Sequence, residues 1–322
     1  MTRPVVVVLD RLLSAERAHS RLDGVDVRED FDGVRLADVI AIVTGPRTRL
    51  DRATLDALVS LKVVAGTSAG HDHLPLAELR RRGVWVTAAR DYCVDEVADH
   101  TLALVVDLLR QVSFHDRLLH DGGWRAGPQW SAPRRLAGTA LGLVGFGRTG
   151  KAVARRAVAL GMAVTAFAPT ASGADLAAHG VRRQETLLDL LGGSDVVSLH
   201  VPLSAETRGL FDATTLAAMR PGAMLVNVSR GEIVDEKALT AALASGRLAG
   251  AALDVFADEP LPASHPLRSS PRAVLTPHIA WWSEGAAIRG GEAAADAVAA
   301  VLRGERPAGA VVDPFASRSV AA

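Results

Sequence analysis

Short apolar runs alternate with stretches of helical periodicity along most of the chain. Residues 141–144 form an apolar run that predicts a buried strand, and residues 151–161 repeat apolar positions at three- and four-residue steps, which predicts a helix. Residues 162–167 then predict a second strand. The same alternation occurs before and after this segment. Strands that alternate with helices are typical of a parallel sheet covered by helices, so the pattern predicts an α/β fold.

The remaining elements follow from the same two periodicities. Strands are expected at residues 5–9, 25–27, 39–43, 62–65, 84–86, 196–201, 224–228, 251–255 and 274–275. Helices are expected at residues 50–61, 74–82, 235–243 and 286–302, and a polar helix-like stretch runs up to residue 22. The apolar periodicity of residues 94–119 is long enough for a helix that connects two domains. The glycines and prolines of residues 122–135 then mark a connector.

Composition narrows the class of protein. The length of 322 residues favours two domains over one, and 49% hydrophobic residues predict a well-buried globular protein. The formal net charge is zero and no basic block stands out, so nucleic acid is not an expected partner. No apolar stretch approaches the ~18 residues of a membrane helix, and the apolar run near the N-terminus is too short for a signal peptide. We therefore expect a cytoplasmic protein with no membrane partner.

The single cysteine, Cys93, excludes an intrachain disulfide and a cysteine-rich metal site. No neighbouring residue in the sequence would activate its thiol, so Cys93 is interpreted as structural. No metal is expected.

Three glycines between the strand at 141–144 and the helix at 151–161 carry the strongest chemical signal. Gly145, Gly147 and Gly150 have the spacing GxGxxG. Three glycines alone are a weak signal, but in a strand–turn–helix–strand context they indicate a dinucleotide-binding turn. The first glycine permits the turn, the second lets backbone amides approach a pyrophosphate, and the third lets the helix pack on the strand. The positive end of the helix then faces the phosphates.

Polar side chains also follow three later predicted strands. Arg230 follows the strand at 224–228, Asp254 and Glu259 lie at the end of the next strand, and His278 follows the last one. A lone histidine is more often exposed or hydrogen-bonded than catalytic, and a loop arginine is often only solvated. Their joint occurrence at successive strand ends is more informative, because ligands of open parallel sheets bind there. A histidine with a carboxylate can donate a proton near neutral pH, and an arginine can hold a carboxylate.

Several stretches together resemble the D-isomer-specific 2-hydroxyacid dehydrogenases. They are GFGRTG at 145–150 and the segments 200–210, 219–239, 250–260 and 275–281, with 68–74 and 91–104 in the N-terminal half. The resemblance covers nearly the whole chain in the order of the family. The segments DYCVDEVADH at 91–100 and HIAWWSE at 278–284 look most like the branch that contains the C-terminal-binding proteins and their bacterial relatives. The loop SAGHDHL at 68–74 is also similar to glyoxylate/hydroxypyruvate reductases.

The resemblance implies a role for particular residues. It implies a catalytic trio in which Arg230 holds the substrate, Glu259 pairs with the histidine, and His278 is the general acid/base. It implies substrate contacts from Ser68, Ala69, Gly70, Arg230 and Trp281. It implies NAD or NADP contacts from Gly145, Gly147, Arg148, Thr149, Gly150, Ala168, Val201, Pro202, Thr207, Ser229, Asp254 and His278.

The resemblance also implies an architecture of two Rossmann-like domains. A flavodoxin-like substrate-binding domain would comprise residues 1–99 and 287–322. A doubly wound NAD(P)-binding domain, residues 100–286, would be inserted in it. Members of the family are typically dimeric through their interdomain helices, so a homodimer is expected. The expected reaction is reduction of a small 2-oxo acid to a D-2-hydroxy acid.

The sequence departs from the family pattern at three places. Ala168 stands where an aspartate is expected to hold the ribose hydroxyls. Thr170 and Ser172 could bond a 2′-phosphate there, but no arginine is adjacent in the sequence, so the choice between NADH and NADPH stays open. The loop around Ser68 reads TSAG rather than the commoner GxG form. Trp282 directly follows Trp281, and two adjacent tryptophans are unusually bulky. The side chain of Trp282 is interpreted as core packing rather than as part of the pocket.

Two alternative functions remain beside the reductase. The branch resemblance permits a nucleotide-sensing scaffold, although the arginine, glutamate and histidine would serve no purpose without turnover. Formate or phosphite oxidation on the same fold is the other alternative. The formate branch replaces the acid that pairs with the histidine by glutamine, whereas Glu259 is present here. Phosphite oxidation retains the trio and stays open.

Overall fold

The chain is divided into two compact units. The computed structural model describes residues 3–10, 20–124 and 132–316. Most of the helix-like stretch before residue 22 and half of the connector at 122–135 lie outside the described residues. Unit 1 comprises residues 1–93 and 282–322, and unit 2 comprises residues 94–281. The sequence-based boundaries lie a few residues later, inside helices α4 (Val94–Arg110) and α11 (Glu284–Leu302).

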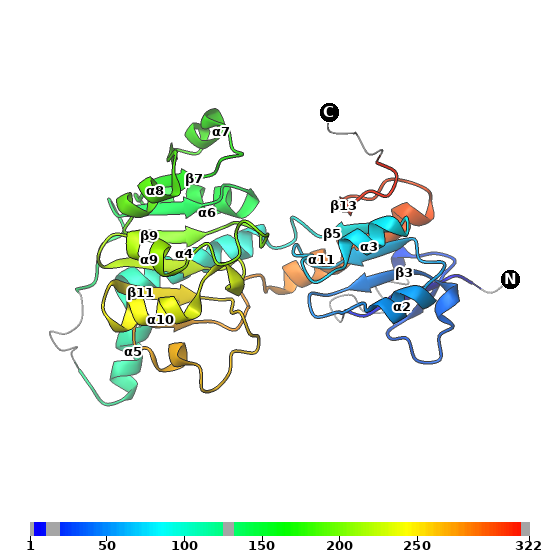
Figure 1. The fold of residues 1–322 in the computed structure, drawn as a ribbon, viewed down its shortest axis with the longest axis horizontal. Helices are drawn as coiled ribbons and strands as arrows, with labels where there is room; N and C mark the ends of the chain where they lie inside the picture. Colours follow the sequence, from blue (N-terminus) through cyan, green and yellow to red (C-terminus); the bar gives the residue numbers. More distant parts are fainter. Residues whose placement is uncertain (1–2, 11–19, 125–131, 317–322) are drawn as a thin grey trace. The chain divides into compact units, whose positions relative to one another are not determined.

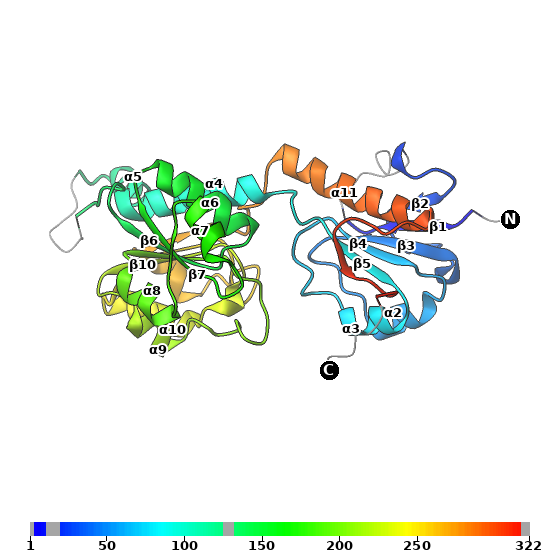
Figure 2. The ribbon, with the colours of Figure 1, turned by 90° about the horizontal axis from the view of Figure 1, so that it is seen from above.

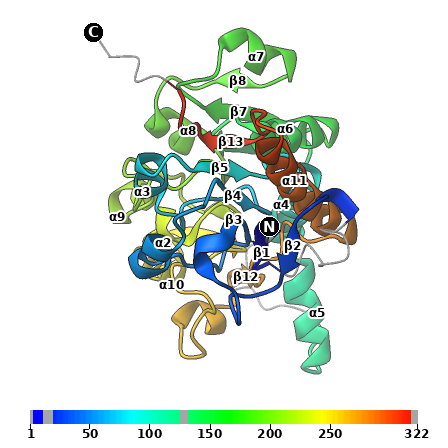
Figure 3. The same cartoon turned by 90° about the vertical axis from the view of Figure 1, so that its right-hand side faces the viewer.

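Unit 1 is built on a six-stranded sheet with the order β13-β5-β4-β3-β1-β2 (Figure 3). Its strands are β1 (Val5–Val8), β2 (Asp26–Arg28), β3 (Val39–Thr44), β4 (Val63–Gly66), β5 (Trp85–Ala88) and β13 (Ala310–Val312). The five N-terminal strands are parallel in the flavodoxin-like order 2-1-3-4-5. The sixth strand, β13, lies at one edge of the sheet and pairs antiparallel with β5.

Helices cover both faces of the sheet in unit 1 (Figure 2). Successive side chains of a strand point to opposite faces, so Val6 and Val8 pack against α11 while Val7 packs on the other side. That other side is covered by α2 (Arg52–Ala57) and α3 (Leu76–Arg81), with the 3-10 turn η1 (Leu36–Asp38) nearby. The continuous valine run of β1 is therefore buried on both faces, as expected for a central parallel strand.

Unit 2 contains a seven-stranded, fully parallel sheet with the order β12-β11-β10-β9-β6-β7-β8 (Figure 1). Its strands are β6 (Ala140–Val144), β7 (Ala163–Phe167), β8 (Arg182–Arg183), β9 (Val196–Leu199), β10 (Ala223–Asn227), β11 (Leu248–Leu253) and β12 (Ala273–Leu275). Counted within the unit, the order begins 3-2-1-4-5-6, which is the doubly wound dinucleotide-binding topology. Its switch point lies between β6 and β9, directly at the glycine turn.

Two helical layers sandwich this sheet. One face is covered by α4, α6 (Arg148–Ala159) and α7 (Gly173–Ala178), and the other by α8 (Leu187–Gly193), α9 (Ala213–Ala218) and α10 (Glu236–Ala244) (Figure 2). The turns η2 (Gly231–Ile233) and η3 (Pro266–Ser269) complete the unit. The sequence did not predict β8 or helices α7 to α9. Those helices have six or seven residues and start at the side-chain caps Ser172, Thr186 and Asp212, so apolar periodicity is too short to reveal them.

The long helix expected over residues 94–119 is broken. Gln111 adopts a left-handed conformation with φ 58°, and α5 (Val112–His120) begins after it. The carboxylate of Asp107 accepts hydrogen bonds from the amide and hydroxyl of Ser113, each at 2.7 Å, and so holds the start of the second helix. No helix in the described part of the chain is long and apolar enough to cross a membrane.

Candidate active site

The residues singled out in unit 2 gather at one edge of its sheet. The glycine turn follows β6, Ala168 follows β7, and Val201 and Pro202 follow β9. Arg230 follows β10, Glu259 lies in the loop after β11, and His278 follows β12. Because all seven strands are parallel, their carboxyl ends lie at the same edge. Ser68, Ala69 and Gly70 lie in unit 1, in the loop after β4.

The glycine turn presents backbone rather than side chains. A Cβ on Gly145 would lie 2.4 Å from the carbonyl oxygen of His200, and one on Gly150 would lie 2.7 Å from that of Gly145. Gly147 instead faces open space and precedes the first residue of α6, where no side chain caps the helix. These three positions leave the amides at the helix start accessible to a phosphate. The turn therefore fits a dinucleotide pyrophosphate, with Arg148 and Thr149 opening the helix.

The loops after β9 and β10 are joined by hydrogen bonds. The hydroxyl of Ser229 donates to the Leu199 carbonyl at 2.7 Å, and the Asn227 amide donates to the Arg230 carbonyl at 2.8 Å. Thr207 donates to the Pro202 carbonyl at 2.7 Å and closes the turn there. These hydrogen bonds fix the backbone at Arg230 and at the residue before it.

The loop after β11 packs directly on the start of η2. A Cβ on Gly231 would lie 1.9 Å from the Phe256 carbonyl carbon, so only glycine fits there. This contact brings the backbone next to Arg230 against the loop that carries Glu259. A positive charge on Arg230 also contributes to the electrostatic environment of Glu259.

Asp254 organises the loop that carries His278. Its side chain is fully buried and accepts hydrogen bonds from the Thr276 hydroxyl at 2.6 Å and from the amides of Ile279 and Ala280 at 2.9 Å. Its carbonyl accepts from the His278 amide at 2.7 Å. Asp254 thus bonds residues on both sides of the histidine. In this structure it is a positioning residue for His278, a role the sequence did not indicate.

His278 and Glu259 form the central pair of the site. Nδ1 of His278 lies 2.7 Å from Oε2 of Glu259, whose other oxygen accepts from the Phe256 amide at 3.0 Å. Burial works to raise the pKa of Glu259, but the hydrogen bonds from His278 and Phe256, with the charges of His278 and Arg230, lower it below its usual range. Glu259 is therefore ionised at neutral pH. The contact through Nδ1 leaves Nε2 on the opposite side of the imidazole ring.

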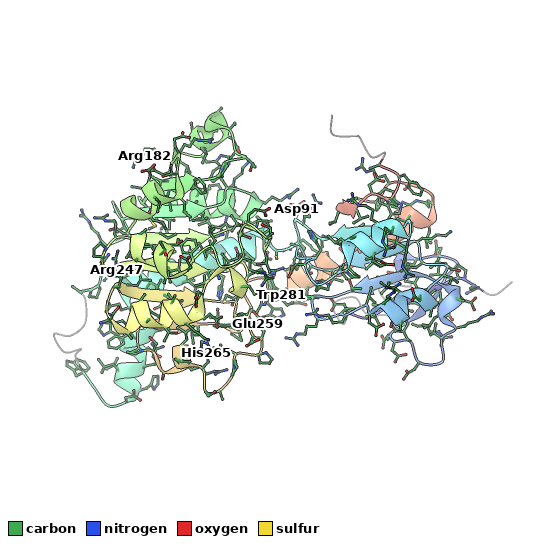
Figure 4. The ribbon with its side chains drawn as sticks, viewed as in Figure 1. Asp91, Arg182, Arg247, Glu259, His265 and Trp281 are labelled. Atoms are coloured by element: carbon green, nitrogen blue, oxygen red, sulfur yellow. The ribbon has the colours of Figure 1, made fainter. Side chains whose placement is uncertain are left out.

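The backbone of His278 is held in an unusual conformation. Its φ is 54°, in the left-handed region that residues other than glycine rarely adopt. Such a conformation costs roughly 1–3 kcal/mol and persists only where the surroundings hold it. Its amide is bonded to Asp254, and its carbonyl accepts from Nε1 of Trp281 at 3.1 Å. Trp281, labelled with Glu259 in Figure 4, therefore fixes the histidine as well as belonging to the expected pocket.

A second histidine–glutamate pair supports the same loop and was not predicted. Nε2 of His265 lies 3.1 Å from Oε2 of Glu236, and the other oxygen of Glu236 accepts from the Ala257 amide at 2.8 Å (His265 is labelled in Figure 4). The sequence placed Glu236 only within the helix expected at residues 235–243. No local pattern marks His265, because its partner lies 29 residues earlier in the chain.

His100 is a further residue that the sequence did not indicate. Its Nε2 lies 3.0 Å from the Thr276 hydroxyl and 3.7 Å from Asp254. Helix α4 thereby contributes to the network around His278. Only the packing of α4 against the sheet brings this residue to the site.

The loop at 68–70 in unit 1 is tightly folded. The Ser68 hydroxyl donates to the Gly70 carbonyl at 3.0 Å, and Ser68 is buried. Gly290 of α11 packs on the preceding residue, since a Cβ there would lie 2.5 Å from the Thr67 carbonyl oxygen. The thiol of Cys93 is buried. The side chain of Trp282 is 66% exposed, so the interpretation of Trp282 as core packing was wrong.

Acidification is expected to destabilise the protein through His200, which lies beneath the glycine turn. Burial lowers the pKa of His200 from 6.5 to about 4. Below about pH 6.5 the unfolded chain binds a proton that the native state does not, so the free energy of unfolding should fall by about 2 kcal/mol by about pH 5. Urea unfolding at neutral and mildly acidic pH measures this change.

The matched variants for that experiment are His200→Asn and His120→Asn. His120 is exposed on α5 and should leave the pH dependence unchanged. An equally steep loss of stability in His200→Asn would show that another group is responsible.

The geometry supports acid–base chemistry on an anionic substrate. A histidine held by an ionised glutamate can exchange a proton, and an arginine two strands away can stabilise negative charge. Within the described residues, no three histidine, cysteine, aspartate or glutamate side chains form a group that could hold a metal ion.

Comparison with known proteins identifies the family. The model described as "D-isomer specific 2-hydroxyacid dehydrogenase, NAD binding domain" matches residues 102–280. A glyoxylate reductase from Thermofilum pendens is 38% identical over 262 residues, which are 80% of this chain and 77% of that relative. The range matched by the family model covers the glycine turn and the strand ends that are followed by Arg230, Glu259 and His278.

Solved structures agree with the sequence comparisons. A protein from Thermus thermophilus is 38% identical with a TM-score of 0.84, and the match covers 96% of this chain and 100% of that one. An NADPH-dependent glyoxylate/hydroxypyruvate reductase from Sinorhizobium meliloti, in complex with NADP and malonate, is 30% identical with a TM-score of 0.84. That match covers 97% of this chain and 98% of that one. The chain therefore belongs to the D-isomer specific 2-hydroxyacid dehydrogenase family and is an NAD(P)-dependent oxidoreductase.

Proposed function

We propose that the protein reduces a small 2-oxo acid of the glyoxylate or hydroxypyruvate class to the corresponding D-2-hydroxy acid. The observation that carries this proposal is the pair of His278 and Glu259, 2.7 Å apart, in the loops after β12 and β11, with Arg230 in the loop after the next strand, β10. The names of the glyoxylate reductase relatives support the substrate class. Unit 2 is the proposed dinucleotide-binding domain and unit 1 the proposed substrate-binding domain.

The proposed mechanism divides the reaction among three side chains. When bound, the reduced nicotinamide supplies a hydride to the carbonyl carbon of the oxo acid. His278 donates a proton from Nε2 to the carbonyl oxygen, and the charge of Glu259 stabilises the protonated imidazole. Arg230 binds the substrate carboxylate and stabilises the negative charge that develops on the oxygen. One 2-oxo acid, one hydride and one proton thus give one 2-hydroxy acid.

The remaining expected contacts belong to the same proposal. The backbone amides of Ser68, Ala69 and Gly70 bind the substrate carboxylate, and Trp281 forms an apolar wall beside the substrate. Ser229 would lie near the nicotinamide, and the buried Asp254 would act there through the loop that it holds, whereas Val201 and Pro202 would lie on the adenine side.

A substrate panel tests the proposal. Glyoxylate, hydroxypyruvate and pyruvate are each assayed with NADH and NADPH, and the oxidation of the cofactor is followed by absorbance. We expect turnover with glyoxylate or hydroxypyruvate and a higher melting temperature with the preferred cofactor. A protein that binds the cofactor and reduces none of these acids would contradict the proposed function.

The same experiment separates the alternatives. Oxidation of phosphite or formate with NAD(P)⁺, without turnover of any oxo acid, would favour the other dehydrogenase reactions. Capture of a protein partner that depends on the bound nucleotide, again without turnover, would favour a scaffold of the C-terminal-binding-protein type. The histidine–glutamate pair supports the reductase, because nucleotide sensing alone needs no proton donor.

A homodimer is part of the proposal. None of the residues of α5 is buried within the chain, and the apolar side chains of Val112 and Leu119 on it are more than half exposed. A second copy that covers α5 would bury them. Leu119→Asp is expected to convert a dimer into a monomer in light scattering coupled to size exclusion, whereas Val59→Asp, at an exposed position in unit 1, is the control. A wild-type monomer would exclude this assembly.

A further inference from the structure

The loop after β7 lacks the acid that normally selects NADH. Ala168 occupies that position and packs, only 6% exposed, against the helices on one face of the sheet. The start of the loop lies at the glycine turn, because the Gly145 amide donates to the Phe167 carbonyl at 3.0 Å. No carboxylate at this position repels a phosphate on the ribose, so the loop at 168–172 is compatible with a phosphorylated dinucleotide.

The neighbouring strand brings an arginine to this loop. Arg183 pairs in register with Ala166 of β7, and its Nη1 donates to the Ala171 carbonyl at 2.8 Å. No arginine is adjacent to the loop in the sequence, as noted above, but the fold places Arg183 beside it. Arg183 lies 15 residues after Ala168, and only the pairing of β8 with β7 makes the two close.

The guanidinium of Arg183 is available for a further anion. Its Nε lies 3.1 Å from a carboxylate oxygen of Glu185, whose side chain is 76% exposed. An exposed ion pair of this kind is weak and can be replaced by a stronger acceptor. The contacts with Ala171 and Glu185 are made by Nη1 and Nε of Arg183. A guanidinium carries five N–H donors, so these two contacts do not use all of them. The side chain of Arg183 is itself 32% exposed, so solvent and ligand can reach it.

Two other cations on α6 are engaged elsewhere. Lys151 of α6 pairs with Asp175 at 2.7 Å, and Arg156 pairs with Asp95 and Asp99 on α4. Ser172, which the sequence suggested as a phosphate ligand, already accepts from the Asp175 amide as the cap of α7. Arg182 precedes Arg183 on the same strand, and its side chain points to the opposite face.

We propose that Arg183 determines cofactor choice by binding the 2′-phosphate of NADPH beside the loop at 168–172. This inference deepens the proposed function, because it names the form of the cofactor that the same site uses. Arginine suits the role, since its planar fork binds phosphate with two charge-assisted hydrogen bonds. The phosphate replaces Glu185 as the partner of the guanidinium.

Binding measurements test this inference without turnover. Arg183→Gln and the matched control Arg182→Gln are titrated with NADPH, NADH, adenosine 2′,5′-bisphosphate and adenosine 5′-monophosphate, with tryptophan fluorescence or calorimetry as the readout. Arg183→Gln should weaken NADPH and the bisphosphate at least about tenfold, as expected for a lost charge-assisted bond, and leave the other two ligands unchanged. Arg182→Gln should bind all four ligands like the wild type.

Two further variants separate charge from loop structure. Arg183→Lys keeps the positive charge but not the planar fork, so its affinity for NADPH should lie between those of the wild type and Arg183→Gln. Glu185→Gln removes the competing carboxylate and should tighten NADPH several-fold, but only when Arg183 is present. Unchanged NADPH affinity in Arg183→Gln would overturn the inference, and so would an equal loss for NADPH and NADH. Arg183-dependent binding of NADPH in a protein that reduces no oxo acid would instead refute only the proposed function.

Discussion

Replacing His278 by alanine is expected to lower kcat for 2-oxo acid reduction by about 10²–10⁴-fold, the usual contribution of a positioned general acid. The imidazole is the group that donates the proton, and its Nδ1 is held by Glu259 at 2.7 Å. Cofactor affinity should stay within a few-fold of the wild type, because the glycine turn is built from other strands. Steady-state kinetics and a cofactor titration measure the two effects.

His278→Asn is the sharper variant. The native φ of 54° strains most side chains, whereas asparagine tolerates the left-handed region well. A large loss of kcat in both variants, with an unchanged melting temperature in His278→Asn, assigns the effect to chemistry rather than to the loop. His120→Asn, on exposed α5, is the control. Wild-type turnover in His278→Asn would remove the histidine from the mechanism.

Arg230→Ala is expected to lower kcat/KM by roughly 10²–10³-fold, the range observed when one donor to a developing oxyanion is removed. KM should rise because the guanidinium is assigned to the substrate carboxylate in the ground state. The kcat should fall because the guanidinium is also assigned to the carbonyl oxygen as negative charge develops on it. Arg230 lies next to Gly231, which packs on the loop of Glu259. Arg230 therefore lies beside the loop that carries the partner of the proton donor.

The same strand supplies the control for Arg230. Arg220 precedes β10 at the opposite edge of the sheet and pairs with Asp195 at 3.0 Å. Arg220→Ala should retain full kcat/KM. Millimolar guanidinium added to Arg230→Ala is expected to restore part of the activity, because the cavity and the rest of the site persist. Full activity of Arg230→Ala would rule out its proposed role, and a loss in Arg220→Ala of the same size would indicate damage to the sheet.

The strained histidine links the fold to the proposed chemistry. The Asp254 carboxylate accepts from the Thr276 hydroxyl before His278 and from two backbone amides after it, and Trp281 donates to the His278 carbonyl. Such strain is tolerated because a buried carboxylate with three donors offsets its cost. Without the Asp254 carboxylate, the amides of Ile279 and Ala280 would lose their hydrogen-bond acceptor. Asp254 therefore affects both the stability of the protein and the position of His278.

The sequence by itself determined the architecture and most of the residues proposed for the site. Apolar runs of four to six residues between helical stretches are a local property, and so is GxGxxG between a strand and a helix. Both were sufficient to predict two α/β units and a dinucleotide-binding turn. Arg230, Glu259 and His278 could be singled out because each lies in the segment that follows a predicted strand, and parallel strands end at one edge.

Tertiary structure alone decided which polar groups meet across strands. Arg183 reaches the loop after β7 through strand pairing, and His100 reaches Thr276 through the packing of α4. Glu236, at the start of α10, meets His265 in the segment after β11. The left-handed backbone at His278 and the antiparallel β13 also depend on partners distant in sequence. A hydrophobic pattern specifies which face of an element is buried, but not which neighbouring element covers it. Contacts of this kind are therefore visible only when the strand order is known.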